Sequence, residues 1–185
     1  MSPFPSVNFC GFVFCVSVED GIVTACVDVC NVGARPGREV VQVYFSAPQG
    51  KLGKPAKQLI GYRKTDLMQP GERRNIRISF DVDAMASYDD LGKVQKSAWL
   101  LEAGDYPVYV GTDVASAAPV SFVHTEPADR VTLQLTAKMV PSQLPERLCA
   151  DGTFEKLPLG EPYDKDEDGL THQSYDKMQN IVPAT

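Results

Sequence analysis

The residues most suited to chemistry are an acidic run near the C-terminus. Asp164-Lys-Asp-Glu-Asp-Gly169 carries oxygen ligands at positions 1, 3 and 5 before a glycine, as the opening of an EF-hand calcium loop does. The twelfth position of that loop is a bidentate glutamate, but Tyr175 stands there, and no helical pattern flanks the run. We therefore interpret it as a solvated acidic linker and expect no metal site.

The histidines and cysteines form no catalytic or metal-binding pattern. His124 and His172 accompany no visible Ser or Cys triad, and we interpret both as ordinary surface or strand residues. The five cysteines, at positions 10, 15, 26, 30 and 149, are odd in number and include no Cys-x2-Cys pair. We expect reduced thiols and no cofactor.

The charge and hydropathy of the sequence argue against nucleic acid and membrane as partners. The formal charge of −6 and a pI near 4.9 argue against a phosphate-binding surface, so we expect no nucleic acid. The apolar run at 9–18 is shorter than the roughly 20 residues that span a bilayer. No lysine or arginine precedes it, as a secretory signal would require. The sequence predicts a cytoplasmic protein with no membrane partner.

Short runs of β-branched and aromatic residues, separated by Gly, Pro and Asp, extend from residue 12 to 112. This pattern predicts an antiparallel β-sandwich. We expect strands at 38–47, 58–64, 73–82, 98–101 and 105–112, with weaker ones at 119–124 and 131–135, and one helical turn within 83–90. The alternation assigns these residues to the core: Val41, Val43, Ile76, Ile78, Phe80 and Val108.

Asp20-Gly21 predicts a tight hairpin between the first two strands. Pairing Glu19 with Ile22 sets inward-facing partners opposite each other: Val18 with Val23, Val16 with Ala25, and Phe14 with Val27. The same register places Cys15 opposite Cys26 on the outer face. This is a hydrogen-bonded pair, with Cα atoms about 5.5 Å apart, whereas cross-strand disulfides fit the closer, non-hydrogen-bonded pairs. We therefore expect two free thiols.

The composition changes from Pro141 onward. Prolines at 141, 145, 158, 162 and 183 accompany the acidic run, which predicts an irregular Pro-rich acidic tail without a core of its own. The chain thus divides into an N-terminal segment (1–11), a β-sandwich (12–137) and a tail or interdomain linker (138–185).

Four stretches carry a family resemblance through their order and spacing: Asn31-Val-Gly33, Gly37-Arg-Glu-Val-Val-Gln-Val-Tyr44, Lys54-Pro-Ala-Lys-Gln-Leu-Ile-Gly-Tyr62 and Gly104-Asp-Tyr106. They resemble the fibronectin type III-like domain of family 3 glycoside hydrolases, which include β-glucosidases and β-xylosidases. The resemblance covers residues 22–112 and implies an all-β fold, a fibronectin type III or immunoglobulin-like sandwich. More weakly, 148–157 looks like the linker that leads into a following barrel in members with permuted domain order.

The resemblance implies a non-catalytic accessory domain, because family 3 takes its nucleophilic Asp from a Ser-Asp-Trp-like motif in a barrel domain. The single tryptophan here lies in Ser97-Ala-Trp99. Such a domain stabilises and orients the catalytic barrel and α/β domains of a retaining β-glycosidase, supplied in cis or in trans, during carbohydrate breakdown. In the family, one loop and strand lie near those partners, which makes five residues our interface candidates: Lys54, Pro55, Lys57, Gln58 and Tyr62.

Two alternatives stay open, a free-standing immunoglobulin-like module that binds protein or carbohydrate, and a truncated gene remnant. A carbohydrate module would need several aromatic residues on one exposed face. The candidates are Tyr44, Tyr62, Trp99, Tyr106 and Tyr109, for which we expect core or interface packing instead.

Overall fold

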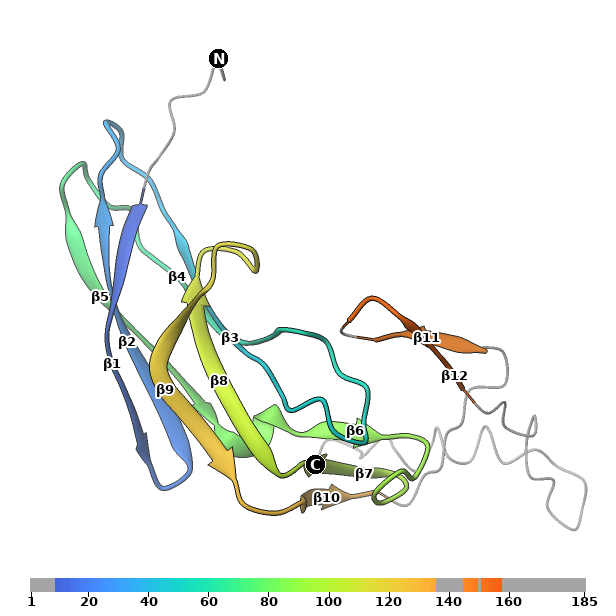
Figure 1. Ribbon diagram of the computed structural model, residues 1–185. Coiled ribbons are helices and arrows are strands. Elements are labelled where there is room, and N and C mark those ends of the chain that lie inside the picture. Colours follow the sequence, from blue (N-terminus) through green and yellow to red (C-terminus); the bar gives the residue numbers. More distant parts are fainter. Residues whose placement is uncertain (1–8, 136–144, 150, 158–185) are drawn as a thin grey trace, which may run out of the picture.

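Two antiparallel sheets form the body of the protein. The computed structural model describes residues 9–135, 145–149 and 151–157, and their side chains from residue 15 onward. One sheet has the order β1-β2-β5 and consists of β1 (Phe9–Glu19), β2 (Ile22–Asn31) and β5 (Arg73–Asp81). The facing sheet has the order β4-β3-β8-β9 and consists of β4 (Gln58–Lys64), β3 (Val40–Phe45), β8 (Gly104–Gly111) and β9 (Ala118–Glu126). Figure 1 shows the two sheets side by side.

Two smaller sheets complete the described part of the chain. Strands β6 (Ser87–Asp89), β7 (Ala98–Leu101) and β10 (Arg130–Gln134) form a three-stranded sheet at one end of the sandwich, in the order β10-β7-β6. A 3-10 turn, η1 (Val82–Met85), leads from β5 towards β6. Strands β11 (Glu146–Leu148) and β12 (Phe154–Lys156) pair as a hairpin beside the long loops of that end (Figure 1).

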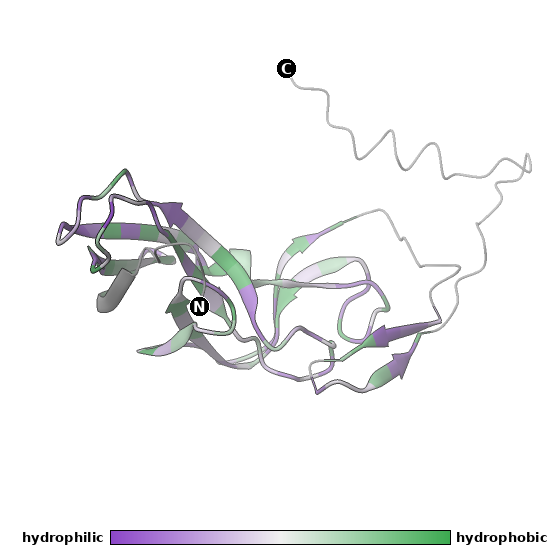
Figure 2. Cartoon of the chain, turned by 90° about the horizontal axis from the view of Figure 1, so that it is seen from above, coloured by the Kyte–Doolittle hydropathy of each residue, from purple (hydrophilic) through white to green (hydrophobic). Residues whose placement is uncertain are grey.

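The core lies between the two large sheets and follows from residue alternation. Because successive strand side chains point to opposite faces, every second residue of β2, β3 and β5 is buried. Figure 2 shows the resulting bands of hydrophobic and hydrophilic residues along the strands. All six predicted core residues are buried, which confirms the strand assignments and the all-β sandwich: Val41, Val43, Ile76, Ile78, Phe80 and Val108.

The first hairpin has the predicted turn but not the whole predicted register. Asp20 and Gly21 take φ of 49° and 78°, and the pairing continues as expected from Glu19 opposite Ile22 to Cys15 opposite Cys26. A bulge between Val13 and Cys15 then places Val13, not Phe14, opposite Val27. The pairing of Phe14 with Val27 was wrong because a bulge adds one residue to one strand and shifts everything beyond it.

Val18 lies opposite the buried Val23, as predicted, but its side chain is not buried. Val18 is 44% exposed, because it stands next to the turn on the edge strand of its sheet and lines an open pocket there. Cys15 and Cys26 face each other as free thiols, although Cys26, predicted on the outer face, is buried. A hydrogen bond between these side chains raises the pKa of Cys15.

Buried polar side chains tie the turns to the sandwich. Asn31 is fully buried, and its Nδ2 donates to the carbonyls of Arg35 and Met68, both at 2.9 Å. At the other end of the domain, the hydroxyl of Tyr106 donates to the carbonyl of Glu102 at 3.0 Å, as in the tyrosine corner of many sandwiches. Burial raises the pKa of Tyr106 to about 12, which keeps this donor protonated.

Replacing Ile78 by Asp should abolish cooperative folding. Ile78 is 6% exposed, and an unpaired carboxylate there would lose its hydration without gaining a partner. Ser79→Asp adds the same charge on the exposed face of the same strand and should fold, at a cost of about 1 kcal/mol for the lost Thr24 hydrogen bond. Thermal unfolding followed by circular dichroism checks both variants. Equal melting of the two would contradict the position of β5 in the core.

Candidate domain interface

A buried ion pair fixes the long loop between β3 and β4. Glu102 is 3% exposed and pairs with Lys54, which is 4% exposed. Glu102 Oε2, which pairs with Lys54, also accepts from the backbone N–H of Leu52 at 3.1 Å. Its other oxygen, Oε1, accepts from the backbone N–H of Lys51 at 2.5 Å. Lys54 donates in addition to the carbonyl of Pro48 at 2.6 Å. These bonds offset the desolvation of both charges and hold the loop in one conformation.

A second buried carboxylate fixes the loop between β6 and β7. Asp89 is fully buried, and its two oxygens accept four backbone N–H groups at 2.7 to 3.0 Å, from Gly92, Lys93, Val94 and Gln95. Burial raises the pKa of Asp89, but these hydrogen bonds outweigh it and hold the pKa below the usual aspartate value. The charge therefore persists at neutral pH and organises the loop around itself.

The hairpin of β11 and β12 is attached to both of these loops through charged residues. Within the hairpin, Arg147 Nε and Nη2 donate to one oxygen of Glu155 at 2.9 and 2.8 Å. Glu155 also pairs with Lys93, and Arg147 lies 4.0 Å from Asp90, both in the β6–β7 loop. The Arg147 guanidinium lies so close to Gly53 that a Cβ there would come within 3.0 Å of it.

The five predicted interface residues lie along the β3–β4 loop and on edge strand β4. Tyr62 is 68% exposed and Pro55 is also exposed, whereas Lys54 is inside its ion pair. Lys57 donates to the carbonyl of Ala117 at 3.0 Å and lies over the ring of Tyr109. Gln58 opens β4, and its Oε1 is buried without a hydrogen-bond partner among the described residues. The assignment of these five to an interface stays a prediction.

The aromatic candidates do not share an exposed face. Tyr44 and Tyr106 are buried, as expected, and Tyr109 is half-buried. Trp99 is 41% exposed on the three-stranded sheet, where its ring centroid lies 5.5 Å from that of Tyr88, and Tyr62 belongs to a different sheet. These rings therefore lie partly in the core and partly on two different sheets, and they do not form one sugar-binding face.

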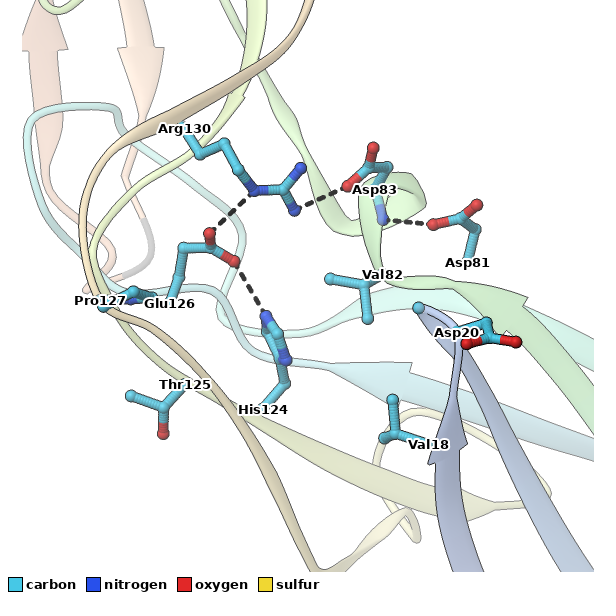
Figure 3. A pocket seen from close by; sticks show the side chains of 11 residues that line it. Val18, Asp20, Asp81, Val82, Asp83, His124, Thr125, Glu126, Pro127 and Arg130 are labelled. Atoms are coloured by element: carbon cyan, nitrogen blue, oxygen red, sulfur yellow. Dashed lines mark hydrogen bonds and ion pairs between the residues drawn. The ribbon is translucent and has the colours of Figure 1, made fainter.

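An open pocket, about 500 Å³, lies near the β1–β2 turn, and Arg130, Glu126, Asp83 and His124 form a linked network in it (Figure 3). Arg130 donates to Glu126 at 2.8 Å and to Asp83 at 2.7 Å, and His124 lies 3.0 Å from the other Glu126 oxygen. Desolvation raises the pKa of Glu126, but hydrogen bonds from Arg130 and His124 outweigh it and lower the pKa. Glu126 is therefore ionised at neutral pH and accepts hydrogen bonds, whereas a general acid would have to be protonated.

The described residues form neither a metal-binding cluster nor a membrane-spanning helix. Among them, no cluster of three His, Cys, Asp or Glu side chains is arranged to hold a metal ion. None of the helices described has the length and hydropathy to cross a membrane. The acidic run 164–169 and His172 lie outside the described residues.

Replacing Lys54 by Met should destabilise the protein by about 3–5 kcal/mol, because Glu102 would stay buried without its cation. Lys51→Met is the matched control: Lys51 is 61% exposed in its pair with Asp129, so its loss should cost about 0.5 kcal/mol. Urea unfolding of both variants gives the comparison. Similar losses for the two would show that the buried pair does not fix the loop.

Replacing Asp89 by Asn should cost about 2–3 kcal/mol at pH 7, because an amide retains one acceptor oxygen for four N–H donors. The folded-state pKa of Asp89 is lowered, so its contribution is present above the unfolded pKa and is lost as the pH falls through the folded value. The difference from the parent should shrink below the ordinary aspartate pKa of 3.8. Unfolding curves measured from pH 7 to pH 3 test this, and a constant difference would contradict it.

Comparison with known proteins supports the resemblance seen in the sequence. Residues 39–114 match the family model of the fibronectin type III-like domain. Beta-glucosidase A of Butyrivibrio fibrisolvens is 52% identical over 147 residues, which are 80% of this chain and 18% of that protein. A Ruminococcus albus beta-glucosidase is 39% identical over 145 residues, 76% of this chain and 15% of that protein.

Solved structures give the same result in three dimensions. The structure of a Paenibacillus barengoltzii beta-glucosidase matches with a TM-score of 0.73 and 31% identity, over 97% of this chain and 20% of that one. Beta-glucosidase 3B from Thermotoga neapolitana matches with a TM-score of 0.58 and 30% identity, over 67% of this chain and 16% of that one. The chain thus spans no more than a fifth of these relatives. It contains a fibronectin type III-like domain of the kind that family 3 beta-glucosidases carry.

Proposed function

We propose that this chain is a non-catalytic accessory domain that stabilises and orients the catalytic domains of a family 3 β-glucosidase. Its partners are the barrel and α/β domains of such an enzyme, joined in cis or supplied in trans. The observation that carries the proposal is the extent of the match. The chain corresponds to 18% of the Butyrivibrio beta-glucosidase, and the domain recognised within that match is the sandwich.

The chemistry of the pocket supports the absence of a catalytic role. Retaining glycoside hydrolysis needs one carboxylate free to attack and one carboxylic acid with a raised pKa. Here Glu126 and Asp83 are both bound to Arg130, and the pKa of Glu126 is lowered. Asp81 accepts the backbone N–H of Asp83 at 2.8 Å and forms the N-cap of η1. Each of these acids has a structural role.

We propose a reducing, cytoplasmic location for the chain. Cys15 and Cys26 lie directly opposite each other on neighbouring strands and are both free thiols. Cys30 and Cys149 are free as well, and the cytosol is the compartment that keeps thiols reduced.

The isolated chain should not hydrolyse p-nitrophenyl β-D-glucoside, whereas a full-length enzyme that contains it should. The enzyme to build is the Butyrivibrio beta-glucosidase with its matching segment replaced by this chain, since the two are 52% identical there. This chimera should keep its activity and melt in one transition. Deletion of the segment should lower Tm, because the contacts between domains are lost.

Glucoside hydrolysis and thermal unfolding of the chain, the chimera and the deletion protein make the comparison. Activity in the isolated chain would overturn its non-catalytic role. A deletion protein with the Tm and kcat/KM of the parent enzyme would overturn its role as a supporting domain.

A further inference from the structure

The hairpin of β11 and β12 has an inner face that contacts the sandwich through charges and an outer face that carries an exposed apolar pair. Side chains alternate between the faces of a strand, and directly paired residues share a face. Arg147 and Glu155 are directly paired, and their face contacts the loops of the sandwich through Asp90 and Lys93. Leu148 and Phe154, also directly paired, are 65% and 68% exposed. The hairpin therefore turns one charged pair, Arg147 and Glu155, towards its own domain, and its outer face carries the apolar pair next to a second charged pair, Glu146 and Lys156.

The exposed apolar pair contributes nothing to the core of the sandwich. A segment that only covered its own domain would bury its apolar side chains and leave its charges in water. The hairpin is nevertheless held firmly in place: Leu157 is buried, and its N–H donates to the carbonyl of Pro145 at 2.9 Å across the base. An isolated hairpin with strands this short would be marginal in water. The salt bridges of its inner face thus hold an apolar pair exposed on its outer face.

Alignment coverage shows in which kind of protein the hairpin occurs. The hairpin lies outside the 39–114 segment of the family model. The Thermotoga and Kluyveromyces structures align over 67% and 70% of this chain, whereas the Paenibacillus structure aligns over 97%. The uncovered remainder in the Paenibacillus case, about six residues, is smaller than the hairpin. The hairpin therefore belongs to the part that this chain shares with a complete beta-glucosidase.

We propose that Leu148 and Phe154 form a docking surface for the catalytic part of the same glycosidase polypeptide. This rests on the proposed function and adds the surface through which the domain acts. The occupant is the catalytic part of the same enzyme, not a second copy of this chain, because the segment that carries the hairpin aligns with a protein five times the length of this match. The two buried carboxylates, Asp89 and Glu102, act through the loops that hold the hairpin.

Hydrogen–deuterium exchange on the isolated chain and on the full-length Butyrivibrio chimera tests the proposal. The hairpin amides at 146–156 should exchange roughly tenfold more slowly in the chimera, because docking suppresses local opening. The double variant Leu148→Ser and Phe154→Ser should abolish this difference and leave the Tm of the isolated chain unchanged, because both side chains point away from the sandwich. Val114→Ser and Leu133→Ser, at residues 51% and 53% exposed, form the matched control and should keep the difference.

Three results would overturn the proposal, and they have different meanings. Equal hairpin exchange in both proteins, with slower exchange elsewhere in the sandwich of the chimera, would leave the proposed function standing and remove this surface from it. Equal exchange throughout the chain would remove the proposed function as well. Slow hairpin exchange in the isolated chain, accompanied by a dimeric mass in sedimentation, would assign the surface to a second copy.

Discussion

Two buried carboxylates hold one end of this sandwich together, and the surfaces at that end depend on them. Long loops carry backbone N–H groups that need acceptors when they are withdrawn from water. Asp89, at the end of β6, accepts four such groups, and Glu102, just after β7, accepts two together with the ammonium of Lys54. Both lie in or beside the three-stranded sheet, which thus serves as the base for two loops that would otherwise lack fixed positions.

The placement of the hairpin follows from these two carboxylates. The loop that Asp89 organises supplies Lys93 and Asp90 to the hairpin, and the loop that Glu102 organises supplies the space at Gly53 in which Arg147 lies. The salt bridges of the hairpin and of the pocket around Arg130 therefore connect parts of one domain. The exposed apolar residues of the hairpin offer a surface for contact with another domain. A supporting role accounts for both features, because it requires defined surfaces and no free reacting group.

Local pattern predicted most of the fold, and long-range pairing explains what it missed. The period-two alternation around Ile78 and the Asp20-Gly21 turn depend on neighbours in the sequence and were predicted correctly. The bulge near Val13 leaves no such local mark. Lys54 was expected at an interface because of its place in the family pattern, yet its partner Glu102 is 48 residues away and no spacing rule joins them. The hairpin had a signal, Asp151-Gly152 between Leu148 and Phe154, but the prolines around it favoured a linker.

The most direct test of the account is the native size of the polypeptide that carries this domain. An antibody raised against the sandwich would follow it through size-exclusion chromatography of extract from its own cells. The account predicts elution together with β-glucosidase activity, at a mass several times the 20.2 kDa of this chain. Elution at the mass of the chain alone, apart from that activity, would contradict it.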